Sequence, residues 1–222
     1  MKTGHNLKTG RTACICCNGE LPESEKARDL AAAADLLIAA DGGAKFLAAM
    51  GLKPKVIIGD MDSLGEDPWV NDRSIQRITF PRDKDRSDTE LAIEWAIEQD
   101  VTHVLLLAAW GGRLDHSLGN GVLLLRFPGR VALWDGGILA LAVTAGQSVN
   151  FRVSLPSVVS LIPYVEGTRV KTEGLKFTRN DEILEYATHG LSNVAVDEQC
   201  SVSVSQGLII LCVEGEDVWL EK

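Results

Sequence analysis

The sequence predicts an α/β domain with a parallel sheet, followed by an all-β domain built as an antiparallel sandwich. In the first half, short apolar runs alternate with segments whose apolar residues recur at helical spacing, which is the pattern of βαβ units. After residue 136 the helical spacing stops, and short β-like runs separated by Gly, Pro, Asn and Asp take its place. We therefore expect a domain boundary close to Asp135 and Gly136.

The apolar runs of the first half are expected to form the strands of the parallel sheet. They occupy residues 12–17, 36–40, 55–59, 75–80, 103–109 and 130–134. Helical spacing lies between most of these runs, at residues 24–34, 43–50, 88–99 and 116–127. Because parallel strands joined by helices have right-handed crossovers, their carboxyl ends lie along one edge of the sheet.

The second half reads as a series of short strands. The β-like runs are LALAV, SVNFRV, SVVSLIP, TRVKTEG, NVAV, SVSV and LIILCV. Several alternate apolar and polar residues with a period of two, such as Val202 and Val204 between serines. This alternation is typical of antiparallel strands that bury one face, so a sandwich or barrel is expected.

The chain ends and the cysteines suggest a soluble cytoplasmic protein. Residues 1–11 are polar and lack the apolar core of a signal peptide, so we treat them as a polar leader outside the fold. The two domains are then expected at residues 12–135 and 136–222. No apolar stretch is long enough to span a membrane. The five cysteines follow no disulfide-scaffold spacing, which favours reduced thiols.

The charge balance narrows the class of partner. The formal net charge of -9 argues against a nucleic-acid groove, which needs a basic surface. If the substrate is a phosphate ester, an acidic protein has to approach it through a divalent cation.

Four strand-to-helix junctions of the first half carry small or acidic residues. They are Asp41 to Gly43, Asp60 to Ser63, Asp83 to Asp88, and Trp110 to Asp115. All four should lie on the edge where open α/β sheets bind ligands. Their coincidence on one edge is stronger evidence for a site than any one of them alone.

Asp60 and Asp62 are candidate magnesium ligands, because carboxylates two residues apart after a buried strand can reach one hard cation. For a lone pair of this kind, a solvated acidic turn is the simpler interpretation. An EF-hand loop fits poorly, since Leu64 occupies a position that needs an oxygen ligand and Asn71 stands where the bidentate Glu belongs. A phosphatase of the haloacid dehalogenase type also fits poorly, because Leu64 stands where it normally has Thr or Val.

Two further loops have both a structural and a functional interpretation. Ser87 and Glu90 form a predicted capping box, which places Asp88 in the first helical turn, with Asp85 just before it. Gly111 and Gly112, followed by Arg113, either let backbone N–H groups approach a phosphate or make an ordinary Gly-rich turn. Asp41 to Gly43 has the same two interpretations, and Asp115 either caps its helix or belongs to the site.

Taken together, these motifs resemble the thiamine pyrophosphokinase family. The matching segments are Ala40–Ala44, Pro54–Leu64, Lys84–Glu90 with Ser87 in place of Thr, Gly111–Asn120, Gly174–Phe177 and Leu191–Asn193. Their order and spacing also fit, and the resemblance covers nearly all of residues 12–213. Phe177 stands where the family often has Trp, which keeps an aromatic face.

The resemblance implies transfer of a diphosphate group from ATP to the hydroxyl of thiamine, releasing AMP. It implies Mg²⁺ on Asp60, Asp62 and Asp88, with Asp85 supporting that site and Arg113 stabilising the transferred group. The nucleotide and substrate cleft would be lined by Asp41, Gly42, Gly43, Gly111, Gly112, Arg113, Asp115, His116 and Asn120.

On the thiamine side the resemblance implies Phe177, Ser192 and Asn193, in a homodimer that binds thiamine across its interface. Two alternatives remain open from the sequence. One is a diphosphotransferase that acts on another alcohol, such as a pterin. The other is a nucleotide- or thiamine-binding protein without catalysis, which the presence of all four acidic residues on the edge argues against.

Overall fold

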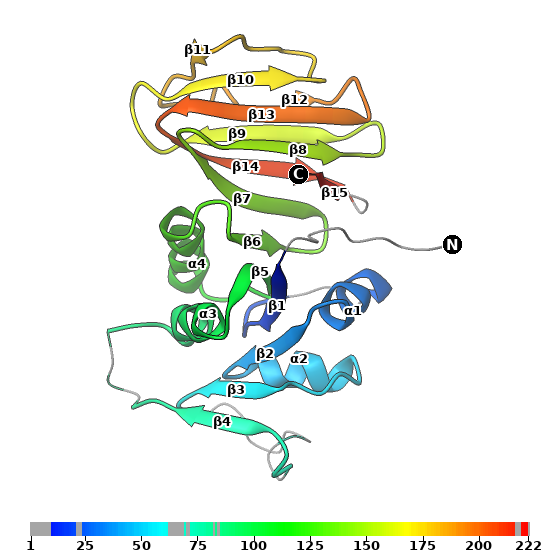
Figure 1. Cartoon of the computed structure of the whole chain (residues 1–222), viewed down its shortest axis with the longest axis vertical. Helices are drawn as coiled ribbons and strands as arrows, with labels where there is room; N and C mark the ends of the chain where they lie inside the picture. Colours follow the sequence, from blue (N-terminus) through cyan, green and yellow to red (C-terminus); the bar gives the residue numbers. More distant parts are fainter. Residues whose placement is uncertain are drawn as a thin grey trace. The chain divides into compact units, whose positions relative to one another are not determined.

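The computed structural model describes residues 10–20, 24–61, 69, 72–81, 83 and 85–215, and the backbone of residues 219–221. The chain forms two compact units, shown in Figure 1. The first, called here the α/β unit, comprises the described residues of Lys8–Leu123 together with Leu133–Gly136. The second, the β unit, comprises Leu124–Ala132 and the described residues from Gly137 onward.

The α/β unit is built on a parallel sheet with the strand order β5-β1-β2-β3-β4. The strands are β1 (Arg11–Cys16), β2 (Leu36–Ala40), β3 (Val56–Gly59), β4 (Gln76–Thr79) and β5 (Val101–Leu107). In the strand order β6 (Val131–Trp134), whose residues are divided between the units, follows β5. Arg11, assigned to the leader by the sequence, instead begins β1, because it pairs with Val101.

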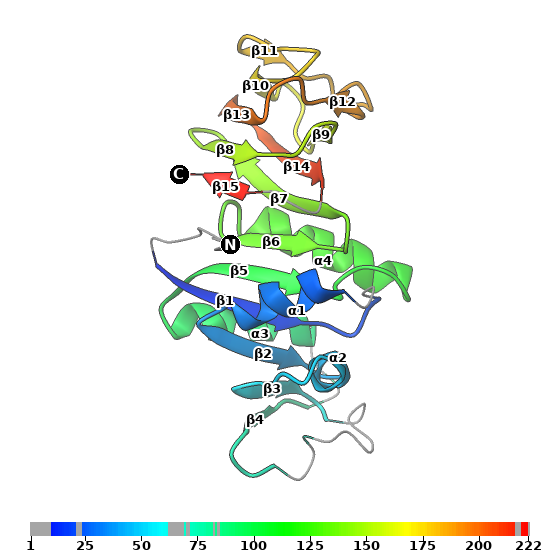
Figure 2. The same ribbon diagram turned by 90° about the vertical axis from the view of Figure 1, so that its right-hand side faces the viewer.

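Helices cover both faces of this sheet. They are α1 (Glu25–Ala32), α2 (Gly43–Ala49), α3 (Asp88–Glu98) and α4 (Leu114–Arg126). Figures 1 and 2 show α1 and α2 on one face, and α3 and α4 on the other. Since both faces are covered, strand residues such as Ile15, Ile38 and Ile57 are completely buried. The predicted strands and helices are confirmed, with ends that differ by only a few residues.

The β unit is a sandwich of two antiparallel sheets. One has the order β12-β9-β14-β7 and the other β11-β10-β13-β8-β15. Their bounds are β7 (Ile138–Thr144), β8 (Ser148–Arg152), β9 (Val158–Pro163), β10 (Arg169–Glu173), β11 (Glu182–Ile183), β12 (Asn193–Val194), β13 (Gln199–Gln206), β14 (Leu208–Glu214) and β15 (Trp219–Glu221). Leu161 and Leu211 of one sheet share a core with Phe151 and Val202 of the other. The predicted fold class is therefore confirmed.

All five cysteines are free thiols, as the sequence predicted. Cys14, Cys16 and Cys17 lie in or directly after β1, which is paired with β5 on one side and β2 on the other, and they are almost completely buried. Burial raises the pKa of the Cys17 thiol to about 12 and raises the pKa of Cys14 and Cys16 as well. None of the helices in the described part of the chain is long and apolar enough to cross a membrane.

Candidate active site

The loops selected from the sequence follow neighbouring strand ends at one edge of the parallel sheet. Gly59 at the end of β3 pairs with Thr79 at the end of β4, and the Phe80 N–H donates to the Gly59 carbonyl at 3.0 Å. The Asp41 N–H, just beyond β2, donates to the Ile58 carbonyl of β3 at 2.8 Å. The shared edge inferred from the βαβ pattern is thus present in the structure.

Asp41 lies against the end of β3. It has a φ of 45°, and its Oδ1 would be 3.3 Å from a Cβ added to Gly59, the residue before Asp60. The same oxygen is buried and has no hydrogen-bond partner within the described ranges. A buried carboxylate oxygen without a partner is costly, so a donor or a cation bound at this point would stabilise it.

Gly43 is required by packing against backbone, whereas Gly42 contacts the end of an exposed side chain. A Cβ on Gly43 would lie 1.9 Å from the Cys16 carbonyl oxygen, and one on Gly42 would lie 2.5 Å from Oδ1 of Asn18. Gly43 therefore lets the start of α2 lie directly against the end of β1. This explains Gly43 without a ligand, and the contact of both glycines with a nucleotide stays a prediction.

The predicted magnesium ligands are only partly described. Asp60 follows β3 and is partly buried, whereas Asp62 lies outside the described residues. Asp88, the first residue of α3, is also partly buried, and Asp85 is exposed. Among the residues that the structure describes, no three Asp, Glu, His or Cys side chains form a group that could hold a metal. The donor type nevertheless fits, because Mg²⁺ prefers carboxylate oxygens.

The start of α3 is fixed by two side-chain hydrogen bonds. The Ser87 hydroxyl oxygen accepts the Glu90 N–H at 3.2 Å, which confirms Ser87 as the N-cap. The Thr89 hydroxyl, which is buried, donates to the Cys17 sulfur at 3.5 Å. Asp88 lies between these two anchored residues, so its position relative to the end of β1 is well defined.

The Gly-rich loop after β5 already binds an anionic group of the chain itself. The Gly112 N–H donates to Oε1 of Glu20 at 3.0 Å, and the Glu20 N–H donates to the Trp110 carbonyl at 2.7 Å. The sequence left two interpretations of this loop open, N–H groups that approach a phosphate or an ordinary Gly-rich turn. In the structure the Gly112 N–H has a carboxylate partner from the loop between β1 and α1.

Arg113 and Asp115 form a bidentate ion pair. Arg113 donates from Nη2 to Oδ2 at 2.6 Å and from Nε to Oδ1 at 3.1 Å. The hydrogen bond from Arg113 lowers the pKa of Asp115 to about 2, and the hydrogen bond to Asp115 raises the pKa of Arg113. The guanidinium is therefore held in one orientation at the start of α4, and it is still exposed to solvent.

A cavity of about 420 Å³ lies beside these groups. It is lined by residues at the start of α3 and along α4: Ser87, Glu90, Asp115, His116, Gly119, Asn120, Val122 and Leu123. Asn120 is buried, and its Nδ2 donates to the Ala109 carbonyl at 2.7 Å. The structure thus brings the predicted residues Asp115, His116 and Asn120 together around a space of the size that a small ligand needs.

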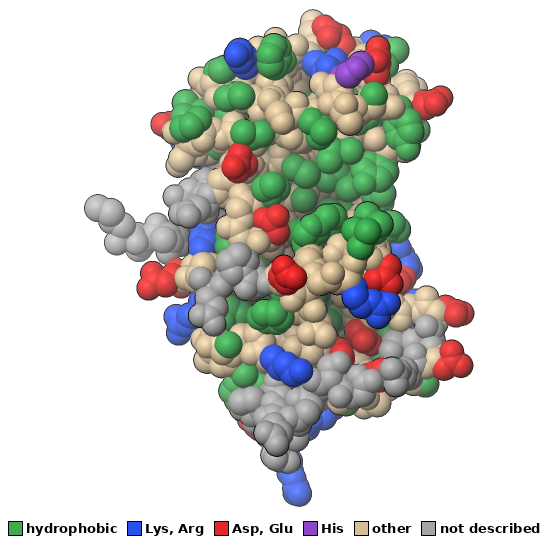
Figure 3. Space-filling view, turned by 180° about the vertical axis from the view of Figure 1, so that it is seen from behind, with side chains coloured by type: hydrophobic (Ala, Val, Ile, Leu, Met, Phe, Trp, Pro, Cys, Tyr) green, Lys and Arg blue, Asp and Glu red, His purple; other side chains and the backbone are tan. Residues whose placement is uncertain are grey.

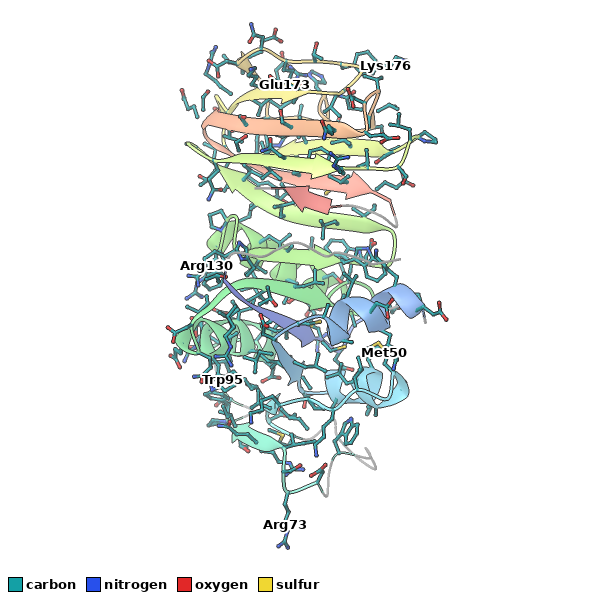
Figure 4. The ribbon with its side chains drawn as sticks, turned by 45° about the vertical axis from the view of Figure 1, so that its right-hand side comes forward. Met50, Arg73, Trp95, Arg130, Glu173 and Lys176 are labelled. Carbon is teal, nitrogen blue, oxygen red and sulfur yellow. The ribbon has the colours of Figure 1, made fainter. Side chains whose placement is uncertain are left out.

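The three candidate residues of the β unit also lie together. The Asn193 side chain is buried and bonds to the backbone of Phe177, whose ring is 63% exposed. Ser192 has a φ of 57°, and its N–H donates to the Ser160 hydroxyl at 3.1 Å. Nζ of Lys176, labelled in Figure 4, lies 5.5 Å from the centroid of the Phe177 ring.

Two family models match the two units of the chain. The model described as "Thiamin pyrophosphokinase, catalytic domain" matches residues 27–132. The model described as "Thiamin pyrophosphokinase, vitamin B1 binding domain" matches residues 148–209. The chain belongs to the thiamine pyrophosphokinase family. The first match contains Asp41, Asp60 and Arg113, and the second contains Phe177 and Asn193.

Individual relatives are similar to this chain in sequence, and solved structures are similar to it in fold. Thiamine pyrophosphokinase of Bacillus subtilis (strain 168) is 27% identical over 186 residues, which is 79% of this chain and 86% of that protein. The crystal structure from Bacillus subtilis has a TM-score of 0.81 at 23% identity and covers 92% of this chain and 99% of that chain. The structure from Geobacillus thermodenitrificans has a TM-score of 0.78 at 26% identity, with coverages of 93% and 98%.

Sequence reasoning missed Asn18, Glu20 and Lys176. The first two lie in the loop after β1, which follows a strand end on the same edge as the loops that were selected. Loops that follow the carboxyl ends of parallel strands bind ligands, and the same argument applied to this fifth loop would have found both residues. Lys176 lies within the matching segment Gly174–Phe177, but no role of its own was inferred for it from the sequence.

Proposed function

We propose that this member of the thiamine pyrophosphokinase family transfers the diphosphate group of ATP to the hydroxyl of thiamine, which releases AMP. The observation that carries the proposal is the arrangement at one sheet edge of the carboxylates Asp60 and Asp88, the cation Arg113 and a cavity of about 420 Å³. Transfers of this kind depend mainly on positioning and on neutralising charge over phosphate oxygens.

Asp60, Asp62 and Asp88 would hold Mg²⁺, with Asp85 as a supporting residue. Oxygen donors after β3 and at the first turn of α3 suit this ion. The buried Oδ1 of Asp41 adds an acceptor directly beside Gly59. When bound, the ion would neutralise charge on the phosphate oxygens, which a chain with a net charge of -9 otherwise repels.

The nucleotide would lie along the loops after β2 and β5 and in the cavity beside α4. Arg113 supplies positive charge for the group being transferred, and its ion pair with Asp115 fixes its direction. Gly42, Gly43, Gly111, Gly112, His116 and Asn120 shape the cleft. The alcohol oxygen attacks the β-phosphorus in line with the departing AMP oxygen, and its proton passes to a base for which Asp85 is our candidate.

On the thiamine side, the exposed Phe177 ring offers a flat apolar surface for the pyrimidine ring of thiamine. Ser192 and Asn193 lie next to it, and Asn193 holds the Phe177 backbone in place. The match of this region to the vitamin B1 binding domain supports the assignment.

An exposed apolar stripe on α4 supports a homodimer that binds thiamine at its interface. Leu114, Leu118 and Val122 follow each other at intervals of four residues and are 71%, 57% and 59% exposed. Figure 3 shows hydrophobic side chains at the surface of this helix. Such a stripe usually becomes buried against a partner. The five free thiols support a cytoplasmic location.

The central test is formation of AMP and thiamine diphosphate from ATP, thiamine and Mg²⁺. We expect turnover with the parent chain and none with Asp60→Asn or Asp62→Asn, each of which should remain folded. Variant activity within about tenfold of the parent, equivalent to about 1.4 kcal/mol of barrier, would contradict the metal assignment. AMP release with a pterin alcohol but not with thiamine would support the other acceptor. Tight thiamine binding without turnover would support a binding protein.

The dimer has a separate test. Sedimentation should give a dimer for the parent chain and a monomer for Leu118→Glu, because burying a new carboxylate in an apolar contact is costly. Leu155→Glu in the β unit, where the parent side chain is 48% exposed, controls for the added charge. A dimer that persists in Leu118→Glu would show that α4 does not form the interface.

A further inference from the structure

We propose that Glu20 is a positioning residue, whose carboxylate fixes the loop of Gly111, Gly112 and Arg113 in the conformation that presents Arg113 to the nucleotide. The inference rests on the proposed function, because it concerns the same site. It adds a residue from the loop between β1 and α1, which lies outside the residues 27–132 matched by the catalytic-domain model.

Glu20 is tied to the loop after β5 through both its backbone and its side chain. Its N–H donates to the Trp110 carbonyl at 2.7 Å, and the two residues form an isolated antiparallel bridge. One residue earlier, the Gly19 N–H donates to the Ala108 carbonyl at 2.6 Å. The Glu20 carboxylate accepts the N–H of Gly112, two residues after Trp110, at 3.0 Å. The two loops are thus joined from Ala108 to Gly112.

The close approach of the two loops depends on glycine. A Cβ on Gly111 would lie 2.8 Å from Cβ and Cδ of Glu20, and one on Gly19 would lie 2.4 Å from the Trp110 carbonyl oxygen. Gly111 also has a φ of 85°, which L side chains rarely adopt. The Glu20 side chain therefore packs directly over the Gly111 backbone.

Gly112 shows why the hydrogen bond matters. It has a φ of 67°, and no atom of the described residues beyond its chain neighbours lies within 4 Å of the place that a Cβ would occupy. No described residue therefore packs against the side of Gly112 on which a Cβ would lie, whereas its N–H is held by the hydrogen bond to Glu20. Arg113 follows directly, so the direction in which its side chain leaves the loop depends on the conformation of Gly112.

A competing interpretation is that Glu20 occupies a phosphate position and has to leave when ATP binds. The backbone bridge to Trp110 argues against this, because it keeps Glu20 beside the loop in any conformation of the Glu20 side chain. A phosphate at the same N–H would also face the Glu20 carboxylate, and like charges repel. We therefore assign the Gly112 N–H to Glu20, and the contact with phosphate to Arg113.

The test compares Glu20→Ala, Glu20→Asp and Glu20→Gln with the parent chain. Glu20→Ala removes the acceptor, and Glu20→Asp keeps the charge but shortens the side chain by one methylene. For both we expect kcat/KM for ATP to fall about tenfold, equivalent to about 1.4 kcal/mol, while KM for thiamine is unchanged. Glu20→Gln keeps an oxygen that can accept the Gly112 N–H, so its activity should stay within about twofold of the parent.

Two results distinguish positioning from a general loss of folding: retained activity in Glu20→Gln, and a fall in kcat/KM for ATP without a change in KM for thiamine. Thermal unfolding of each variant checks directly that it is folded. If Glu20→Ala does not fold, Glu20→Asp carries the comparison. Tighter ATP binding in Glu20→Ala, or unchanged kcat/KM in both short variants, would overturn the proposal. A parent chain that binds ATP with Mg²⁺ but releases no AMP would refute the proposed function alone, and ATP affinities by calorimetry would then decide the role of Glu20.

Discussion

The side-chain amide of Asn193 makes two reciprocal hydrogen bonds with the backbone of Phe177. Oδ1 accepts the Phe177 N–H at 3.0 Å, and Nδ2 donates to the Phe177 carbonyl at 2.9 Å. Oδ1 also accepts the Val194 N–H at 2.9 Å. The amide thus extends the pairing between Lys176 and Val194, in which the Lys176 N–H donates to the Val194 carbonyl at 2.8 Å. By holding the Phe177 backbone, it fixes the position from which the exposed aromatic ring projects.

Asn193→Asp tests this arrangement. The new carboxylate keeps the acceptor but loses the donor and faces the Phe177 carbonyl oxygen, so we expect a loss of about 1–3 kcal/mol in the free energy of unfolding. KM for thiamine should rise if Phe177 stacks on it. Asn180→Asp, the same change at an exposed position, is the control. Denaturant unfolding and steady-state kinetics measure both effects, and equal behaviour of the two variants would contradict the assigned role.

Gly112→Ala and Gly51→Ala form a matched pair. The two glycines have φ values of 67° and 66°, and at neither one does an atom of the described residues beyond the chain neighbours lie within 4 Å of the Cβ position. Since neither Cβ would meet an atom of those described residues, each substitution should destabilise the chain by a similar amount, about 1–2 kcal/mol, from the left-handed backbone. We expect only Gly112→Ala to lower kcat/KM for ATP, because it alters the loop before Arg113. Parallel losses of activity in both variants would refute a specific role for the loop.

The ion pair of Arg113 and Asp115 makes a prediction about pH. Arg113 lowers the pKa of Asp115 from 3.8 to about 2, so this pair stabilises the fold above about pH 4 and the stabilisation is lost as the pH falls toward 2. In Arg113→Gln the pKa of Asp115 should return toward 3.8. Carboxyl chemical shifts followed by NMR during an acid titration give the value, and an unchanged pKa would argue against the bidentate contact in solution.

Ser87→Ala and Asp88→Asn separate structure from chemistry at the start of α3. Ser87→Ala removes the N-cap and should cost about 1 kcal/mol of stability while leaving most activity. Asp88→Asn should change stability by less than about 1 kcal/mol through the helix dipole, yet abolish turnover. Thermal unfolding and AMP formation measured on both proteins test this contrast. Full activity of Asp88→Asn at saturating Mg²⁺ would exclude Asp88 as a metal ligand.

The elements of the fold could be predicted because their signals are local. The periodicity of apolar residues located β2 and α3 nearly to the residue, and βαβ topology then placed Asp41 and Asp60 at one sheet edge. The contacts that organise the site could not be predicted in this way. The bond from Gly112 to Glu20 joins residues 92 positions apart, and the need for Gly43 arises only where α2 meets the end of β1.

The rate at which the buried cysteine thiols at β1 react with a thiol reagent reports on local unfolding of the chain. Thiol reagents attack the thiolate, which is scarce at neutral pH when burial raises the pKa as it does for Cys14 and Cys17. Labelling therefore requires β1 to separate from β5 or β2, and its rate reports on this opening of the sheet. Cys200, buried in β13, reports in the same way on the sandwich. Mass spectrometry of peptides after timed alkylation would thus compare how readily the two units open, with no engineered cysteine needed.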